Sequence, residues 1–270
     1  MNKSVQMLQE RYEEAIKQYN FFDFNFWNDP LDIERFYPAP GKFEAIEQIR
    51  KVCTAGVLMT NGASKTVDPG IGNGRLVELL NPADNVFGAL IVTPDPQFSG
   101  PAFEEYIDKM TKAGVVALRL YPKRFYHSLS DTVCGEFYEI LESYNMPLII
   151  SHVETSWDGI ESLCKRHPNM KIVVDGGDAK ILYHNRDYMA MLKAYDNLFV
   201  DTHGLVVYDE IEDLCKIVGA EKLVFGSYAV YNEPAISITS IAFAHISEEE
   251  KKLIAHGNAF RLLDGAGKKK

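Results

Sequence analysis

Residues 115–121 read VVALRLY, a short and almost continuous apolar run that follows Gly114 and carries one arginine near its end. Runs of this kind are typical of parallel strands that are covered on both faces. Seven similar runs recur at intervals of about 30 residues, the usual length of a strand and its following helix. They are Phe21–Trp27, Gly56–Asn61, Val86–Val92, Pro147–His152, Lys171–Val174, Leu198–His203 and Lys222–Ser227.

Helical patterns fill the intervals between these runs. Pro101–Ala113 begins with proline and ends before glycine, which are the usual start and stop signals. An extra helix, Ser4–Tyr19, precedes the first strand. Strands and helices that alternate in this way predict an α/β protein, a single (β/α)8 barrel domain over residues 1–270 with an additional N-terminal helix. The other expected helices are Lys42–Lys51, Gly74–Leu80, Asp131–Tyr144, Trp157–His167, Arg186–Tyr195, Tyr208–Val218 and Ser237–Ala244.

A doubly wound open sheet is the alternative architecture. It would need a glycine-rich phosphate turn directly after an early strand. The nearest candidate, GIGNG at residues 70–74, is separated from the run ending at Asn61 by polar residues and departs from GxGxxG. We therefore interpret it as a loop and helix cap, which favours the barrel.

Composition and charge exclude several classes of protein. The chain is 46% hydrophobic and 24% charged, the balance of a globular protein, and no run approaches the roughly 20 apolar residues of a membrane span. Residues 1–17 are charged throughout, so we expect no secretory leader and a cytoplasmic location. The net charge is −10, and the basic cluster Lys268–Lys270 is terminal, which predicts no nucleic-acid and no membrane partner.

The four cysteines, Cys53, Cys134, Cys164 and Cys215, form no CxxC pair. This spacing is unlike that of a disulfide scaffold or a zinc knuckle. We therefore expect reduced thiols in the core.

Polar residues gather where the predicted strands end. The active sites of (β/α)8 barrels lie at this end, and residues two apart on a strand share a face. A hydrogen-bond network that merely closes the barrel would use the same residue types, so a ligand is one of two interpretations. The pairs are Asn25 and Trp27, Arg119 and Tyr121, His152 and Glu154, and Asp201 and His203.

In their order and their amino-acid sequence these segments resemble the amidohydrolase superfamily. More narrowly, they resemble its amidohydrolase-related branch, which includes pyrone-dicarboxylate lactonases and aminocarboxymuconate-semialdehyde decarboxylases. The resemblance runs over nearly the whole chain. It implies a (β/α)8 barrel and small carboxylate or lactone substrates. Its carriers are GVVALRLY at 114–121, PLIISH at 147–152, PNMKIVV at 168–174, NLFVD at 197–201, LVFGS at 223–227 and IAHGNAFRL at 254–262.

The departures from the family pattern concern its metal ligands. The family places Asp-x-His-x-His on the first strand, where this chain has Asp23-Phe24-Asn25-Phe26-Trp27. Asp175 stands where the sixth strand would end in histidine, and Tyr228 where the family has its aspartate. Of the expected ligands only His152 remains, and a catalytic zinc normally takes three.

We therefore expect no metal and no other cofactor. The alternative is a divalent ion on a new ligand set, His152, Glu154, Asp201 and His203.

These residues favour an enzyme, a hydrolase or lyase with a reworked site and a small carboxylate or lactone as its partner. His152, Asp201 and His203 are the expected catalytic residues, with a histidine as base and Asp201 orienting it. Arg119 would grip a substrate carboxylate. The remaining substrate-binding residues would be Asn25, Trp27, Tyr121, Glu154 and Tyr228.

The alternative is a pseudoenzyme that serves as a ligand sensor or as an oligomer scaffold, for example half of a homodimer. Charged and titratable groups kept at the strand ends favour a retained ligand. Ser227 lacks the second glycine of GxSxG, so a serine nucleophile is not expected. The histidines outside the strand ends are expected to be solvated; they are His127, His167, His184, His245 and His256.

Overall fold

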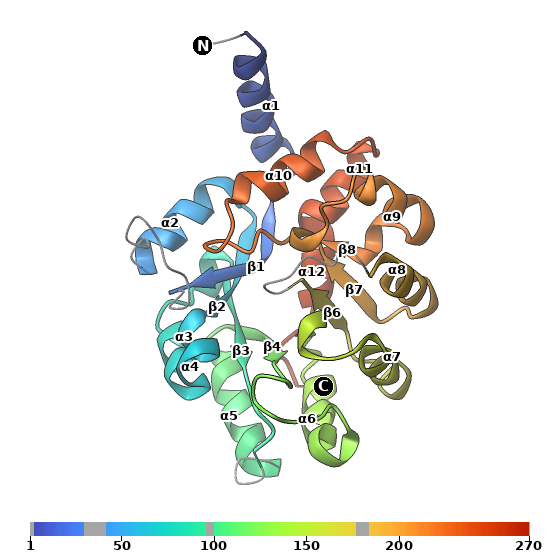
Figure 1. Cartoon of the computed structure of the whole chain (residues 1–270). Coiled ribbons are helices and arrows are strands. Elements are labelled where there is room, and N and C mark those ends of the chain that lie inside the picture. Colours follow the sequence, from blue (N-terminus) through green and yellow to red (C-terminus); the bar gives the residue numbers. More distant parts are fainter. Residues whose placement is uncertain (1–2, 30–41, 96–99, 177–183, 270) are drawn as a thin grey trace.

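The computed structural model describes residues 3–29, 42–95, 100–176 and 184–269. Eight parallel strands follow one another in chain order around a barrel, and helices surround them (Figure 1). The predicted (β/α)8 fold is confirmed. The strands are β1 Phe22–Asn28, β2 Gly56–Asn61, β3 Val86–Ile91, β4 Val115–Leu120, β5 Leu148–Ser151, β6 Ile172–Asp175, β7 Leu198–Asp201 and β8 Leu223–Val224.

The barrel closes between β1 and the chain that leaves β8. The backbone N–H of Phe24 donates to the carbonyl of Phe225, and that of Tyr228 donates to the carbonyl of Asn25, both at 2.9 Å. Strand β8 itself ends at Val224. The closing edge is therefore irregular, and it delivers Tyr228 into the mouth of the barrel.

Most of the predicted helices lie close to their expected positions, but the helix predicted over Gly74–Leu80 begins five residues and ends three residues earlier, as Pro69–Val77. In α5 the residues Phe103, Ile107 and Met110 are buried at helical spacing, which is why this segment is a helix against the sheet. Helix α1 projects from the barrel, and its Met7 and Leu8 are exposed (Figure 1). The helices are α1 Lys3–Tyr19, α2 Lys42–Val52, α3 Gly62–Thr66, α4 Pro69–Val77, α5 Gly100–Lys112, α6 Asp131–Ser143, α7 Trp157–Arg166, α8 Asn185–Ala194, α9 Glu210–Val218, α10 Pro234–Phe243, α11 Glu248–Lys252 and α12 Asn258–Leu263.

The segment 70–74, interpreted above as a loop and cap, belongs to helix α4, so that interpretation is wrong. Asp68 caps the helix by accepting from the backbone N–H of Ile71, and Pro69 occupies its first turn. Gly72 is required because a Cβ there would lie 2.0 Å from the backbone nitrogen of Ser64. The glycines thus allow α3 and α4 to pack closely.

Five strands end one to three residues before the predicted runs, namely β3, β4, β5, β7 and β8, and two of these ends shape the site. Strand β5 ends at Ser151 and β7 at Asp201, and each continues as a 3-10 turn, His152–Glu154 and Thr202–Gly204. The Asp201 carboxylate accepts the backbone N–H of His203 at 2.7 Å, which turns the chain there. The alternation assumed for these two strand ends is therefore wrong beyond Ser151 and Asp201.

Apolar side chains fill the inside of the barrel below the mouth. Ala117, Ile149, Val173 and Val224 belong to one buried cluster, to which α12 also contributes. A larger cluster packs the helices onto the outside of the sheet. In the part of the chain that the structure describes, no helix is long and apolar enough to cross a membrane.

Candidate functional site

A polar layer lies directly above the apolar interior. Two positions beyond Ala117, Ile149 and Val173 come Arg119, Ser151 and Asp175, which point inward by strand alternation. Their relative exposures are 1%, 2% and 1%. The strand ends therefore place charged and polar groups in a desolvated mouth, where every unpaired polar atom is costly.

Arg119 is the centre of this layer. Its Nη1 donates to Asp175 Oδ2 at 2.5 Å, its Nη2 to Asn25 Oδ1 at 2.7 Å, and its Nε to Thr60 Oγ1 at 2.8 Å. Burial opposes the charge on Arg119, but Asp175, Tyr121 and other neighbouring groups raise its pKa above the usual value. The arginine that the sequence suggested as a substrate grip is thus held by partners within the protein.

The amide of Asn25 links the arginine to the seventh strand. Its oxygen accepts from Arg119 and also from Trp27 Nε1 at 3.0 Å. These two donors determine the orientation of the amide group. Its nitrogen therefore faces Asp201 Oδ2 at 2.6 Å and His203 Nδ1 at 3.2 Å. A register shift in β1 between Asp23 and Phe26 accompanies this arrangement.

Asp201 and His203 form a carboxylate–imidazole pair. Asp201 Oδ1 lies 3.0 Å from His203 Nδ1 and also holds the backbone of that histidine. Gly226 leaves room for the carboxylate, because a Cβ at this position would lie 2.4 Å from both of its oxygens. When Nδ1 carries the proton, the lone pair of the ring is on Nε2.

Asp23 lies beneath this pair and is fully buried. Its carboxylate accepts from the backbone N–H of Ser227 at 2.9 Å, from the hydroxyl of the same serine, and from the backbone N–H of Asn25 at 3.0 Å. Burial nevertheless raises the pKa of Asp23 to about 6. Ser227 is therefore a partner of this aspartate.

An aromatic roof, Trp27, Tyr121, Tyr228 and Tyr231, covers the layer. The ring of Tyr228 stacks on His203 with centroids 4.5 Å apart, and it also stacks on Tyr231 at 4.8 Å. Trp27 makes edge contacts with the three tyrosines. The Nζ atom of Lys65 lies 5.6 Å from the centre of the Trp27 ring, so a cation also borders the roof.

A second group of rings follows β5. His152 stacks on Trp157 with centroids 5.9 Å apart, and His184 lies 5.3 Å from His152. Burial lowers the pKa of His152, whose Nδ1 lies 3.3 Å from the backbone oxygen of Asp175. The expectation that His184 is simply solvated is wrong, since it is half-buried against this group.

Glu154 lies apart from these residues. Because the chain turns at His152, the carboxylate of Glu154 accepts from the backbone N–H of Arg124 at 2.9 Å. It lines a groove outside the polar layer together with Pro122 and Lys123. The predicted pairing of His152 and Glu154 on one strand face therefore does not occur.

Two atoms of the polar layer have no hydrogen-bond partner among the described residues. They are Ser151 Oγ and Asp175 Oδ1, and both are fully buried. Their residues are register partners in β5 and β6, so the two side chains stand next to each other on the inner face.

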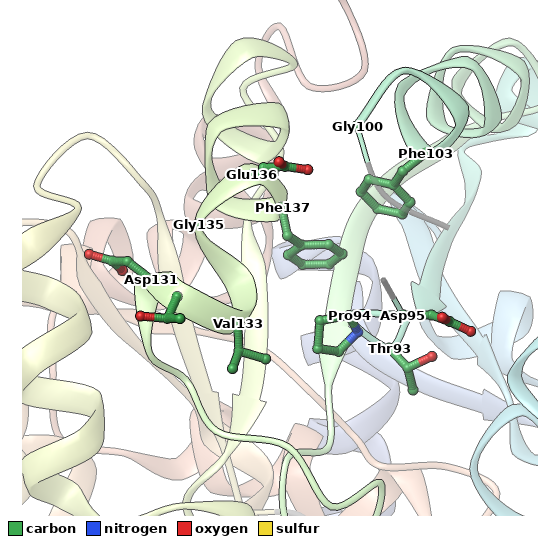
Figure 2. A pocket seen from close by; sticks show the side chains of 11 residues that line it. Thr93, Pro94, Asp95, Gly100, Phe103, Asp131, Val133, Gly135, Glu136 and Phe137 are labelled. Carbon is green, nitrogen blue, oxygen red and sulfur yellow. The ribbon is translucent and has the colours of Figure 1, made fainter. Parts of the chain in front are cut away.

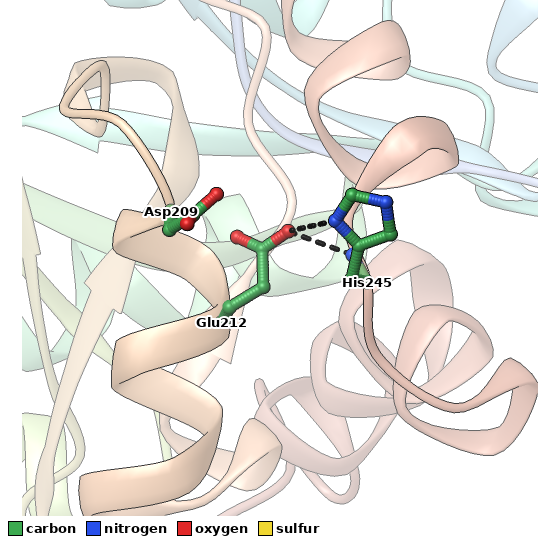
Figure 3. A group of neighbouring side chains, drawn as sticks. All are labelled: Asp209, Glu212 and His245. Atoms are coloured by element: carbon green, nitrogen blue, oxygen red, sulfur yellow. Dashed lines mark hydrogen bonds and ion pairs between the residues drawn. The ribbon is translucent and has the colours of Figure 1, made fainter.

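Two further features lie outside the mouth. A cavity of about 390 Å³ lies between the chain after β3 and the starts of α5 and α6, with Phe103 and Phe137 facing each other in it (Figure 2). On α9 and after α10, Glu212 lies between Asp209 and His245, and the backbone N–H of His245 donates to it at 2.7 Å (Figure 3). That trio is the one cluster of at least three potential His, Cys, Asp or Glu ligands found within the described residues.

Comparison with known proteins supplies the family. The amidohydrolase family pattern matches residues 61–265, well over half of the chain. The chain belongs to the amidohydrolase family. No protein among those with curated descriptions matches the sequence.

Several solved structures share the fold at low sequence identity. A TIM-barrel protein from Bordetella bronchiseptica superposes with a TM-score of 0.69 and 14% identity, over 92% of this chain and 99% of that one. The 5-carboxyvanillate decarboxylase of Sphingomonas paucimobilis gives 0.64 and 14%, over 91% and 99%. The 4-oxalomesaconate hydratase of Rhodopseudomonas palustris gives 0.65 and 19%, over 91% and 96%.

Several residues in or beside the mouth of the barrel were not predicted from the sequence. Thr60 and Ser151 stand at strand ends, which is a usable signal, but threonine and serine are too common there to be singled out. Lys65 and Trp157 lie on helices, and His184 lies just before one. Only the folded chain brings these three to the mouth.

Proposed function

We propose that this amidohydrolase-family chain is a hydrolase or lyase that acts on a small carboxylate or lactone by acid–base chemistry. The observation that carries the proposal is the pairing of Asp201 with His203 Nδ1 at 3.0 Å in a buried mouth. A carboxylate in this position fixes the ring and its tautomer, so that Nε2 can take or give a proton. The activities of two structural neighbours, a decarboxylase and a hydratase, support small carboxylates as the substrate class.

The residues at the family's metal positions do not fit a catalytic metal ion. The one ligating oxygen of Asn25 already accepts from Arg119 and Trp27, and an indole nitrogen has no lone pair to offer. The Arg119 guanidinium places a permanent cation in the same layer. We therefore derive no step through a metal, and propose that His203 works without one.

Each remaining group has a role in this proposal. Asp201 holds His203 and stabilises its protonated form during the reaction. His152 has a pKa lowered by burial, so it is a neutral donor or acceptor at the end of β5, two strands from β7. Tyr228, stacked on His203, keeps the ring in place and narrows the space above it. Arg119 positions the amide of Asn25, which in turn contacts Asp201.

The test is a turnover screen over small lactones and carboxylic acids, run with and without a chelator, on wild-type protein and on His203→Gln. We expect turnover that survives the chelator and falls at least 100-fold in His203→Gln. His245→Gln, an exposed histidine outside the mouth, is the matched control and should keep full activity. Turnover that disappears with the chelator, or that is unchanged in His203→Gln, would contradict the proposal.

A pseudoenzyme that only binds its ligand is the second candidate. The observation in its favour is the closed network, because Arg119 is 1% exposed and Trp27 0%. Binding of a small acid or lactone without turnover of any compound in the screen would select this alternative.

A further inference from the structure

The side of the mouth formed by β5 and β6 differs from the rest of the polar layer. Around Arg119, Asn25 and Asp201 every buried polar side chain named above has a partner. At Ser151 and Asp175 one atom each, Oγ and Oδ1, has none among the described residues, although the residues are 2% and 1% exposed. Buried polar atoms in native proteins are almost always paired, so such atoms mark a place that another molecule completes.

We infer that Ser151 Oγ and Asp175 Oδ1 form a specificity subsite that recognises a hydroxyl group of the ligand. This inference builds on the proposed function by naming what the substrate must carry. The two residues are register partners on neighbouring parallel strands, about 4.8 Å apart in backbone spacing. One hydroxyl placed between them can donate to the carboxylate oxygen and accept from the serine.

The charges around the subsite select the chemical class. Asp175 Oδ2 is neutralised by Arg119 at 2.5 Å, while Oδ1 keeps a full acceptor capacity. A carboxylate at this point would face a second anion, and an ammonium group would add an uncompensated charge to a desolvated site. A neutral hydroxyl group causes neither charge repulsion nor an uncompensated buried charge. The ligand is therefore a hydroxylated acid or lactone whose hydroxyl lies on the β5–β6 side.

The subsite lies next to the strand that leads to His203, because β6 pairs with β7. His152 borders it, because its Nδ1 lies 3.3 Å from the backbone oxygen of Asp175. The buried Trp157 Nε1, on the ring that stacks on His152, also has no partner among the described residues. The hydroxyl end of the ligand would thus be fixed at β5–β6, and the reacting end directed towards β7.

The experiment measures binding with two matched pairs of probes, benzoate with 2-hydroxybenzoate, and γ-butyrolactone with α-hydroxy-γ-butyrolactone. Titration calorimetry on wild-type protein should give at least tenfold tighter binding of the hydroxylated member in at least one pair. In Ser151→Ala the ratio within that pair should fall at least threefold. The control is Ser64→Ala, a buried serine whose hydroxyl donates to Asn73 at 3.0 Å between α3 and α4, and it should keep the wild-type ratio.

Thermal unfolding adds a readout that needs no ligand. Ser151→Ala removes an unpaired hydroxyl and should leave the melting temperature unchanged or raised, whereas Ser64→Ala should lower it. Equal affinity within both pairs, no binding of any probe, or a preference that survives in Ser151→Ala would overturn the subsite. Selective binding with no turnover in any assay would instead leave the subsite standing and remove the proposed catalysis.

Discussion

The buried ion pair between Arg119 and Asp175 allows a direct test of how much the polar layer contributes to the stability of the fold. The two side chains are 1% exposed, and their N–O distance is 2.5 Å. At an effective dielectric constant of about 20, the Coulomb attraction at this distance is about 7 kcal/mol. Most of that gain is offset by desolvation, but removal of one partner leaves an unpaired buried charge and costs roughly 3–5 kcal/mol.

We therefore expect Asp175→Leu and Arg119→Met each to lower the free energy of unfolding by about 3–5 kcal/mol. The double variant should cost clearly less than the sum, with a coupling energy of about 2–3 kcal/mol. It should still cost something, because Asn25 and Thr60 lose their guanidinium donor. The assay is urea unfolding followed by tryptophan fluorescence, in which Trp27 reports directly on the mouth.

The chain offers a matched control for this cycle. Asp108 and Lys112 form an ion pair with the same N–O distance of 2.5 Å, but their side chains are 49% and 73% exposed. Solvent screens such pairs, so Asp108→Ala should leave the unfolding midpoint unchanged. If Asp175→Leu unfolded at the wild-type midpoint as well, burial would not govern the energy of the pair and the reasoning would be refuted.

Two further predictions concern buried groups beneath and beside the mouth. Because burial raises the pKa of Asp23 to about 6, the stability that this group contributes is full below about pH 4 and is lost as the pH rises through 6. The free energy of unfolding of Asp23→Asn, measured by urea unfolding, should therefore rise relative to wild type by up to roughly 3 kcal/mol between pH 4 and 7. A difference that does not depend on pH would contradict the titration of this buried carboxyl group. In helix α4, Gly72→Ala should destabilise by roughly 1–3 kcal/mol because its Cβ would meet the Ser64 backbone at 2.0 Å. Gly74→Ala, with nothing within 4 Å of its Cβ, should instead stabilise by about 0.5–1 kcal/mol, and equal effects of the two changes in thermal unfolding would show that α3 and α4 do not pack as described.

The fold could be predicted because its signal is spread over many residues. Apolar runs such as Gly56–Asn61 coincide with a strand over their whole length, and Pro101–Ala113 differs from α5 by one residue at each end. Periodicity reports what packs against the sheet. It does not report where a strand stops, since Asp201 ends β7 through a hydrogen bond to the next turn rather than through its hydropathy.

The residues that form the mouth could be predicted in part from the sequence, whereas the hydrogen bonds and ion pairs between them could not. Strand position correctly brought Asn25, Arg119 and Asp201 into one layer. The partner of Arg119 is Asp175, 56 residues along the chain, and no spacing rule connects the two. The position of His184 was not predicted for a related reason. Nothing in the sequence around a histidine that precedes a helix indicates that it will contact the ring of His152.

The residues of the mouth depend on one another. The amide of Asn25 is oriented only because Arg119 and Trp27 donate to its oxygen, and the charge of Arg119 is tolerated only because Asp175 lies beside it. A change of Asn25 alone to leucine would leave two buried donors without an acceptor while the guanidinium stayed in place. Replacement of this layer by another set of side chains therefore requires Asn25, Arg119 and Asp175 to change together.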